Sequence, residues 1–178
     1  MKTISFLVLG LAVVGFMYGQ QKTPGKVITE FGATYTVNNP DFKTNTEHNF
    51  KVVFDVGRSF EDATKVNPLL ETAARFINMH AAAGVPLQHI KVALVVHGNA
   101  ANDLLNDNAY AVQHGGSNPN TPLLKALAEQ NVQLILCGQT ANYRKLTKEQ
   151  LVPDIRIALS AMTALVQLQN DGYRLIHF

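Results

Sequence analysis

Short apolar runs, separated by stretches with helical spacing, dominate the chain after residue 50. The runs cover residues 50–56, 90–96, 132–136, 155–159 and 173–178. Runs of this length, rich in Val, Ile, Leu or Phe and bounded by glycine or polar residues, are typical of buried strands. The pattern therefore predicts five strands, and the third is followed by the only cysteine of the chain.

Helix signals fill the intervals between these strands. Asn67 with Pro68 supplies an N-cap and a proline at the first helical position, and Thr121-Pro122 starts another helix. Further helices are predicted over 104–114 and after Ser160. Strands that alternate with helices predict one three-layer α/β domain with a mainly parallel sheet.

The first residues differ in character from the rest. Met1-Lys2 gives a positive start, residues 4–17 are almost all apolar, and small and polar residues follow at 18–21. This pattern is typical of a secretory signal peptide, and the apolar run is shorter than a transmembrane helix normally requires. We expect a signal peptide over residues 1–19 and export, most simply to a bacterial periplasm. An uncleaved N-terminal anchor is the alternative.

The mature chain divides into two parts. Residues 20–49 form an N-terminal arm, in which some alternation at 31–37 allows a strand or one arm of a hairpin. Residues 50–178 carry the predicted strands and helices and form the α/β domain. Contact with a membrane is expected only through the signal peptide before cleavage.

Charge and cysteine content narrow the possible partners. Without the signal peptide, 14 basic and 13 acidic side chains leave a net charge of +1, and no basic run is interleaved with aromatic residues. This balance argues against nucleic acid as a partner. A single cysteine in an oxidising compartment has no intramolecular disulfide partner, so it is a buried spectator, an intermolecular link or a reactive thiol.

Cys137 is the first candidate for chemistry, because it stands at the carboxyl end of a predicted strand, where open parallel sheets bind ligands. Gly138 and Gln139 follow and can present backbone amides, which lower the pKa of a thiol and favour the nucleophilic thiolate. Arg144 and Lys145 lie slightly further along the chain. The alternative is a structural cysteine buried among apolar side chains.

His97 ends the second predicted strand much as Cys137 ends the third. If the two strands are neighbours, the imidazole can stabilise the thiolate or relay a proton; otherwise it bonds to its own loop. Asn99, in the polar cluster after His97, and Arg58, after the first strand, are supporting candidates. Arg58 suits an anion at this edge, and a solvated arginine is the alternative.

Sequence motifs for metals and cofactors are missing. No ligand pair of the CxxC or HxxxH kind supports a metal site built from His97, His114 and Cys137. A single glycine, Gly57, follows the first strand in place of a glycine-rich dinucleotide motif. We therefore expect neither a metal nor a cofactor.

Five short motifs, by their order and spacing, resemble the DsrE/DsrF-like family, specifically its small exported branch. They are Phe54-Asp55-Val56, Val96-His97-Gly98, Asn118-Pro119-Asn120, Cys137-Gly138-Gln139 and the stretch from Leu168 to Tyr173. The resemblance covers roughly residues 50–178. It implies a five-stranded parallel α/β/α fold that assembles into trimers or hexamers, with the second and third strands side by side.

The resemblance also implies an activity. Better-known members are sulfur carriers whose cysteine takes up a persulfide and passes it to a partner, and Cys137 maps to that position. Those carriers work in the cytoplasm, whereas the predicted signal peptide removes this chain from cytoplasmic partners. We expect an exported sulfur carrier that uses Cys137, supported by His97, with a sulfur donor and an acceptor protein. The alternatives are a non-enzymatic oligomeric module that binds a small ligand, and a periplasmic thiol sensor.

Overall fold

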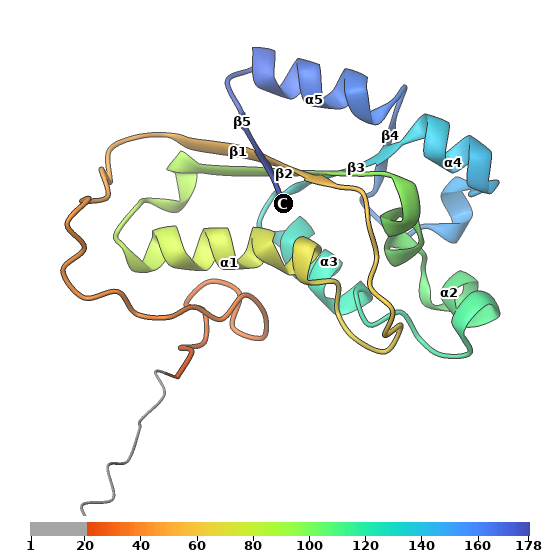
Figure 1. Cartoon of the computed structure of the whole chain (residues 1–178), viewed down its shortest axis with the longest axis horizontal. Coiled ribbons are helices and arrows are strands. Elements are labelled where there is room, and N and C mark those ends of the chain that lie inside the picture. Colours follow the sequence, from red (N-terminus) through yellow and green to blue (C-terminus); the bar gives the residue numbers. More distant parts are fainter. Residues whose placement is uncertain (1–20) are drawn as a thin grey trace, which may run out of the picture.

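Five parallel strands form one sheet in the order β4-β3-β2-β1-β5 (Figure 1). The computed structural model describes residues 21–178, so the predicted signal peptide at 1–19 lies outside the described residues. The strands are β1 (Phe50–Val56), β2 (Ile90–Val96), β3 (Gln133–Cys137), β4 (Arg156–Ala158) and β5 (Arg174–His177). The predicted parallel sheet is confirmed, and so is the placement of the second strand beside the third.

Helices connect the strands and cover both faces of the sheet. They are α1 (Pro68–Ala82), α2 (Asp107–His114), α3 (Thr121–Glu129), α4 (Gly138–Arg144) and α5 (Ala161–Asn170), with the 3-10 helices η1 (Leu87–His89), η2 (Gly98–Leu104) and η3 (Lys148–Gln150). Figure 1 shows α1 and α3 below the sheet and α5 above it. No helix within residues 21–178 combines the length and the apolar character needed to cross a membrane.

Alternate side chains of the central strands point into two separate hydrophobic cores. Leu94 and Leu136 belong to the larger core, which they share with side chains of α1 and α3. Val95, Ile135 and Cys137 belong to the smaller core, which α5 covers. The candidate thiol therefore lies on the face of the sheet that a single helix shields.

Most predicted element boundaries agree with the structure. β1 and β2 begin and end at the predicted residues, and the side chain of Asn67 caps α1 as predicted. The helix predicted over 104–114 is shorter than expected, because Asn106 supplies the N-cap and α2 starts only at Asp107. The residues before it form η2 instead. One element was not predicted as a helix, namely α4, which begins directly after Cys137.

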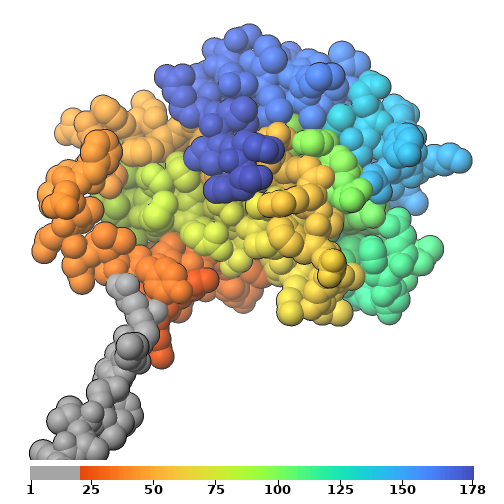
Figure 2. Space-filling view, viewed as in Figure 1, coloured from red at the N-terminus to blue at the C-terminus, as the bar shows by residue number. Residues whose placement is uncertain are grey.

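The N-terminal arm is fastened to α1 mainly through one buried side chain, and Glu71 on α1 also accepts the amide N–H of Gly32. Asn78 on α1 exchanges hydrogen bonds with backbone groups of residues 27–32. Residues 31–37 form no regular strand, and Thr34 pairs only with Thr23 in an isolated antiparallel bridge. Because side chains of α1 form hydrogen bonds with these backbone groups of the arm, the groups are not available to pair with another strand. Figure 2 shows the start of the arm at the end of the molecule opposite α5.

Candidate functional site

Cys137 is the last residue of β3 and the N-cap residue of α4. The strand passes into the helix without a loop, and this places the thiol beside the first amides of α4. Only 6% of the residue is exposed. Gly138 makes the arrangement possible, because a Cβ at that position would collide with the carbonyl oxygen of Ala158 in β4.

Polar groups from two helices surround the sulfur. Burial raises the pKa of the Cys137 thiol, but interactions with the amide and hydroxyl of Thr140 and the amides of Ala161 and Gln139 outweigh burial, so the pKa is lowered overall. The thiol makes no capping hydrogen bond of ordinary geometry to α4, so these groups act mainly by attracting the charged sulfur. Amides from the first turns of α4 and α5 thus favour the thiolate.

The hydroxyl of Thr140 links this sulfur to the loop after β2. Gly98 donates its amide N–H to Thr140 Oγ1 at 3.3 Å, which leaves the hydroxyl hydrogen available for Cys137. Gly98 has a φ of +56°, and a Cβ there would collide with the carbonyl oxygen of Gly57. The glycine is therefore required for the amide to reach Thr140.

His97 lies beside Cys137 in the sheet, but its imidazole forms its hydrogen bond with β1 and not with β3. Val96 pairs with Leu136, so His97 and Cys137 are the next residues along the two neighbouring strands. The Nε2 of His97 is 2.8 Å from Oδ1 of Asp55 on β1. The prediction that His97 acts on the sulfur stays a prediction, and its structural connection to Cys137 runs through the adjacent amide of Gly98.

Asp55 holds two histidines at the carboxyl edge of the sheet. Besides His97, the carboxylate contacts Nδ1 of His177, which is 3.2 Å from Oδ2. The carboxylate fixes the orientation of both rings and joins the ends of β1, β2 and β5. Asp55 was part of the sequence motif of the first strand, but its role as the partner of His97 was not predicted.

The supporting candidates fall into two groups. Gln139 is next to the sulfur through its amide, and its side chain donates to the carbonyl oxygen of Leu159 at 3.1 Å. Asn99 is tied to α4, because its Oδ1 accepts from the guanidinium of Arg144. Arg58 is exposed, and its guanidinium lies 5.7 Å from the ring centroid of Phe60. The structure thus brings Gln139 to the thiol and leaves Arg58 on the surface.

No cluster of three or more His, Cys, Asp or Glu side chains within residues 21–178 is arranged to hold a metal ion. His114, considered above with His97 and Cys137, packs instead against Tyr110 with ring centroids 4.3 Å apart. The described residues thus give no support to that combination.

Thr140 and Ala161 are the groups at the sulfur that sequence reasoning missed. The sequence signal for Thr140 was present, because a hydroxyl three residues after the cysteine lies in the first turn of a following helix. For Ala161 the signal was weaker. Ser160 was predicted to start a helix, but only the folded sheet shows that this helix begins over Cys137.

The comparison with protein families classifies the chain. The model of the DsrE/DsrF-like family matches residues 51–178, which include the whole sheet except Phe50, the first residue of β1, and the whole Cys137 region. The chain belongs to the DsrE/DsrF-like family. No curated protein is similar enough to count as a match.

Two solved structures have the same fold as this DsrE/DsrF-like chain. One is MTH1491 from Methanobacterium thermoautotrophicum, a protein of unknown function, with a TM-score of 0.55. The other is the ychN protein from E. coli, with a TM-score of 0.52. Each is 18% identical in sequence, and each alignment covers 72% of this chain and 99% of the other. At this identity the two likenesses establish the fold.

Proposed function

We propose that this DsrE/DsrF-like chain is a sulfur carrier that holds a persulfide on Cys137. The thiolate attacks the outer sulfur of a donor persulfide, R–S–SH. A new bond forms between Sγ of Cys137 and this outer sulfur, and the S–S bond of the donor breaks. The donor leaves as the thiolate R–S⁻ with the bonding electron pair. An acceptor thiolate then attacks the outer sulfur of the Cys137 persulfide and regenerates the Cys137 thiolate. The two steps balance without an external oxidant or reductant.

The observation that carries the proposal is the set of donors around the sulfur. Amides of Gln139, Thr140 and Ala161 and the hydroxyl of Thr140 all favour the anionic form of Cys137. A cysteine that serves only to fill the core needs apolar neighbours and has its pKa raised by burial. Here burial is outweighed by polar groups, and the thiolate is the nucleophilic form that sulfur transfer requires.

The same donors suit the persulfide product. A persulfide anion carries its negative charge on the outer sulfur. The amides that stabilise the thiolate need to shift only slightly to stabilise the persulfide anion as well. The low exposure of Cys137 limits access to slender donors and shields the bound sulfur from bulky thiols. We infer that inorganic polysulfide is a suitable probe, because its chain is only one atom wide.

The test is a mass measurement on the intact protein. Purified wild-type protein is incubated with polysulfide, freed of excess reagent and weighed, with Cys137→Ser as the matched control. We expect the wild type to gain the mass of one or more sulfur atoms and to lose it on addition of a small thiol, while the variant gains nothing. If the wild type gains no sulfur although a small alkylating reagent modifies Cys137, the carrier proposal fails.

The low exposed fraction of Cys137 also favours the alternative of a structural cysteine in a ligand-binding module. That alternative predicts no alkylation of the folded protein and an effect of Cys137→Ala on stability alone. A thiol sensor predicts a third result, namely reversible sulfenic acid formation with peroxide and no transfer of sulfur to an acceptor thiol. The same sample of protein can be carried through all three reactions.

Export and assembly are part of the proposal. We propose that residues 1–19 are removed on export to the periplasm, which the charge and apolar pattern of the sequence support. Fractionation of cells and N-terminal sequencing of the exported chain test this, and a full-length chain in the cytoplasm would contradict it. We also propose that the protein forms a homo-oligomer, a trimer or hexamer, through the exposed apolar side chains around α5.

A further inference from the structure

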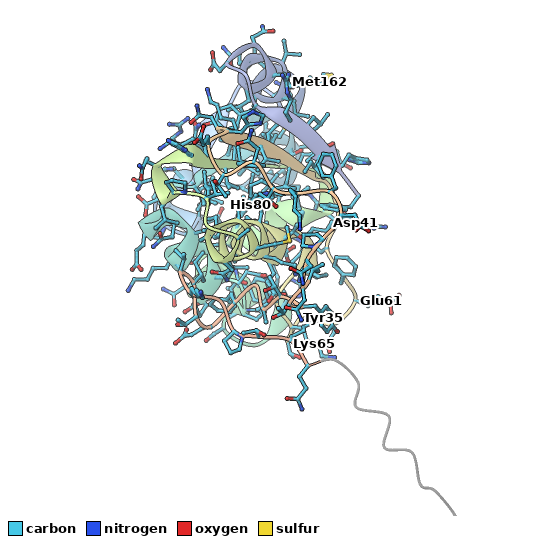
Figure 3. All side chains as sticks on the ribbon, turned by 90° about the vertical axis from the view of Figure 1, so that its left-hand side faces the viewer. Tyr35, Asp41, Glu61, Lys65, His80 and Met162 are labelled. Carbon is cyan, nitrogen blue, oxygen red and sulfur yellow. The ribbon has the colours of Figure 1, made fainter. Side chains whose placement is uncertain are left out.

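A second candidate site lies at the same carboxyl edge of the sheet, apart from the thiol. A cavity of about 670 Å³ opens between the segment that follows β1 and the helices η2 and α2, and Cys137 does not line it. Its volume falls in the range of small-molecule sites. Phe60, Val66 and Tyr110 give it apolar walls. Figure 3 shows Glu61 and Lys65, which also line it, near the outer surface of this segment.

A buried carboxylate lies in the wall of this cavity. Asp103 is only 6% exposed, and its Oδ2 accepts hydrogen bonds from Nδ2 of Asn67 at 2.6 Å and from Oγ of Ser59 at 2.8 Å. Its Oδ1 accepts no hydrogen bond from any residue that the structure describes. Burial raises the pKa of Asp103, while Asn67, Ser59 and the charge of His114 oppose the shift. The described residues do not fully enclose Oδ1, so a donor from a ligand or from water can reach it from the cavity.

The Asn118-Pro119-Asn120 motif holds this carboxylate in place from behind. Asn118 donates to the carbonyl oxygen of Asp103 at 2.9 Å, and its own Oδ1 accepts from Asn120. Asn120 in turn accepts the amide N–H of Asn67 at 2.7 Å. All four side chains are buried. The network satisfies its members internally and leaves the free oxygen of Asp103 as its unused acceptor, as in a preorganised binding site.

The remaining polar groups of the cavity add further acceptors. The side-chain amide of Asn102 makes no hydrogen bond to the described residues, and Glu61 forms no ion pair with them. Lys65 forms an ion pair with Asp62 at 2.8 Å, so its charge is already compensated. The cavity therefore offers hydrogen-bond acceptors and the carboxylates of Glu61 and Asp103 next to an apolar wall, with the guanidinium of Arg58 on the Phe60 ring as a nearby cation.

We propose that this cavity binds a small organic amine in its ammonium form. The ammonium group donates to Asp103 Oδ1 and to the side-chain oxygen of Asn102, and the apolar body of the amine packs against Phe60 and Val66. A bare metal ion fits less well, because the described residues provide no cluster of three ligands there. The site does not use Cys137 and does not depend on sulfur transfer.

The test compares three probes of similar size, benzylamine, benzyl alcohol and benzoate, by amide NMR titration of the purified protein. We expect benzylamine to shift the amide signals of residues 59–68 and of η2 and to bind at least about tenfold more tightly than benzyl alcohol. Benzoate should not bind. Equal binding of all three probes, or no shift of these signals by benzylamine, would overturn the proposal.

Variants identify the groups responsible. Asp103→Asn keeps the shape and the acceptor for Asn67, and it should lower the affinity for benzylamine to that for benzyl alcohol. If this buried substitution prevents folding, the exposed His114 provides a second pair. His114→Lys should weaken benzylamine binding and His114→Glu should strengthen it, because both change the charge at the cavity wall without touching the core. A folded Asp103→Asn protein with unchanged affinity, or identical affinities for the two His114 variants, contradicts the assignment.

Discussion

Thr140 is the residue through which the chemistry of Cys137 can be changed most selectively. The other groups that stabilise the thiolate are backbone amides, which no substitution of a side chain removes. The hydroxyl of Thr140 is also held in place by the amide of Gly98. The contribution of this one group is therefore open to a direct measurement.

We predict that Thr140→Val raises the pKa of the Cys137 thiol, because the valine has the same shape and no hydroxyl. The rate of alkylation by a small reagent at neutral pH should fall by about threefold to tenfold, since the thiolate fraction falls. The check is the pH profile of the alkylation rate. Thr140→Ser keeps the hydroxyl and should retain the wild-type profile. Identical profiles for the valine variant and the wild type would show that the hydroxyl has no influence on the sulfur.

The lowered pKa of Cys137 also predicts how stability depends on pH. The folded protein binds the thiol proton more weakly than the unfolded chain, whose value is near 9.0, because the surrounding amides outweigh burial. The free energy of unfolding should therefore increase as the pH rises through the folded pKa towards 9.0, and the increase is lost as the pH falls below the folded pKa. Urea denaturation of wild type and Cys137→Ser over this range measures the difference. A constant difference at every pH would contradict the prediction.

At the residue scale, the sequence points to the candidate thiol but to only part of its surroundings. Cys137 could be chosen because one cysteine follows a strand and precedes a glycine. The amide of Ala161 could not be assigned to it, because this contact depends on where α5 crosses the sheet. The orientation of His97 was also not predictable, since Asp55 competes for the imidazole and a single sequence does not rank such partners.

At the scale of elements, the close approach of α4 to β4 depends on Gly138. We predict that Gly138→Ala destabilises the protein by about 1–3 kcal/mol, because the new Cβ collides with the backbone carbonyl of Ala158, which cannot move away as a side chain would. Gly116→Ala is the matched control, since a Cβ there meets no atom. Urea denaturation gives both values. Equal stability of the two variants would show that α4 can retreat without cost.

The attachment of the N-terminal arm is a second property of an element that depends largely on one side chain. We predict that Asn78→Leu frees the arm, because the variant leaves several backbone groups of residues 27–32 without partners, at about 1–3 kcal/mol for each buried group. Limited proteolysis followed by mass spectrometry should show rapid cleavage within residues 21–34. Asn108→Leu, on the exposed surface of α2, should be cleaved like the wild type. An intact arm in the Asn78 variant contradicts this account.

Regular elements were predictable where local signals and burial agree. β1 and β2 combine apolar runs with clear boundaries, and Asn67-Pro68 marks the start of α1. The arm was not predictable, because its conformation depends on bonds to Asn78, a residue far along the chain. The helix α4 was missed because its seven residues carry no apolar periodicity of their own.

At the scale of the whole molecule, the distribution of exposed apolar side chains bears on assembly. Met162 on α5 is 75% exposed and projects from the outer side of the helix in Figure 3. Leu159, which precedes α5, Val166 on α5 and Tyr143 on α4 are also exposed. We predict that Met162→Glu shifts the proposed oligomer towards the monomer, because a buried charge without a partner opposes association.

Light scattering after gel filtration measures the mass of each species. Val112→Glu is the matched control, because Val112 is 88% exposed on α2, away from α5, and its substitution should leave the oligomer unchanged. A wild-type protein that elutes as a monomer at every concentration contradicts the assembly proposal. Equal dissociation by both variants would instead point to a general effect of added charge.

The overall architecture could be predicted because strands and helices alternate with short connections throughout residues 50–178. The order of the strands required the family resemblance, since one sequence does not determine which strand lies at the centre. The cavity beside Asp103 was not foreseen, because it forms between a loop with no regular structure and a helix that begins later than its sequence pattern indicates.

The attachment of residues 27–32 to Asn78 determines how the protein can be presented on a surface. In Figure 1 the described chain begins below α1, whereas α5 lies on the opposite side of the sheet. Any tether joined ahead of residue 21 therefore pulls on the α1 side and leaves the α5 side facing away from the support. A sensor chip or a resin that captures the chain by an N-terminal tag would thus offer the α5 side, with Cys137 beneath it, to molecules in solution.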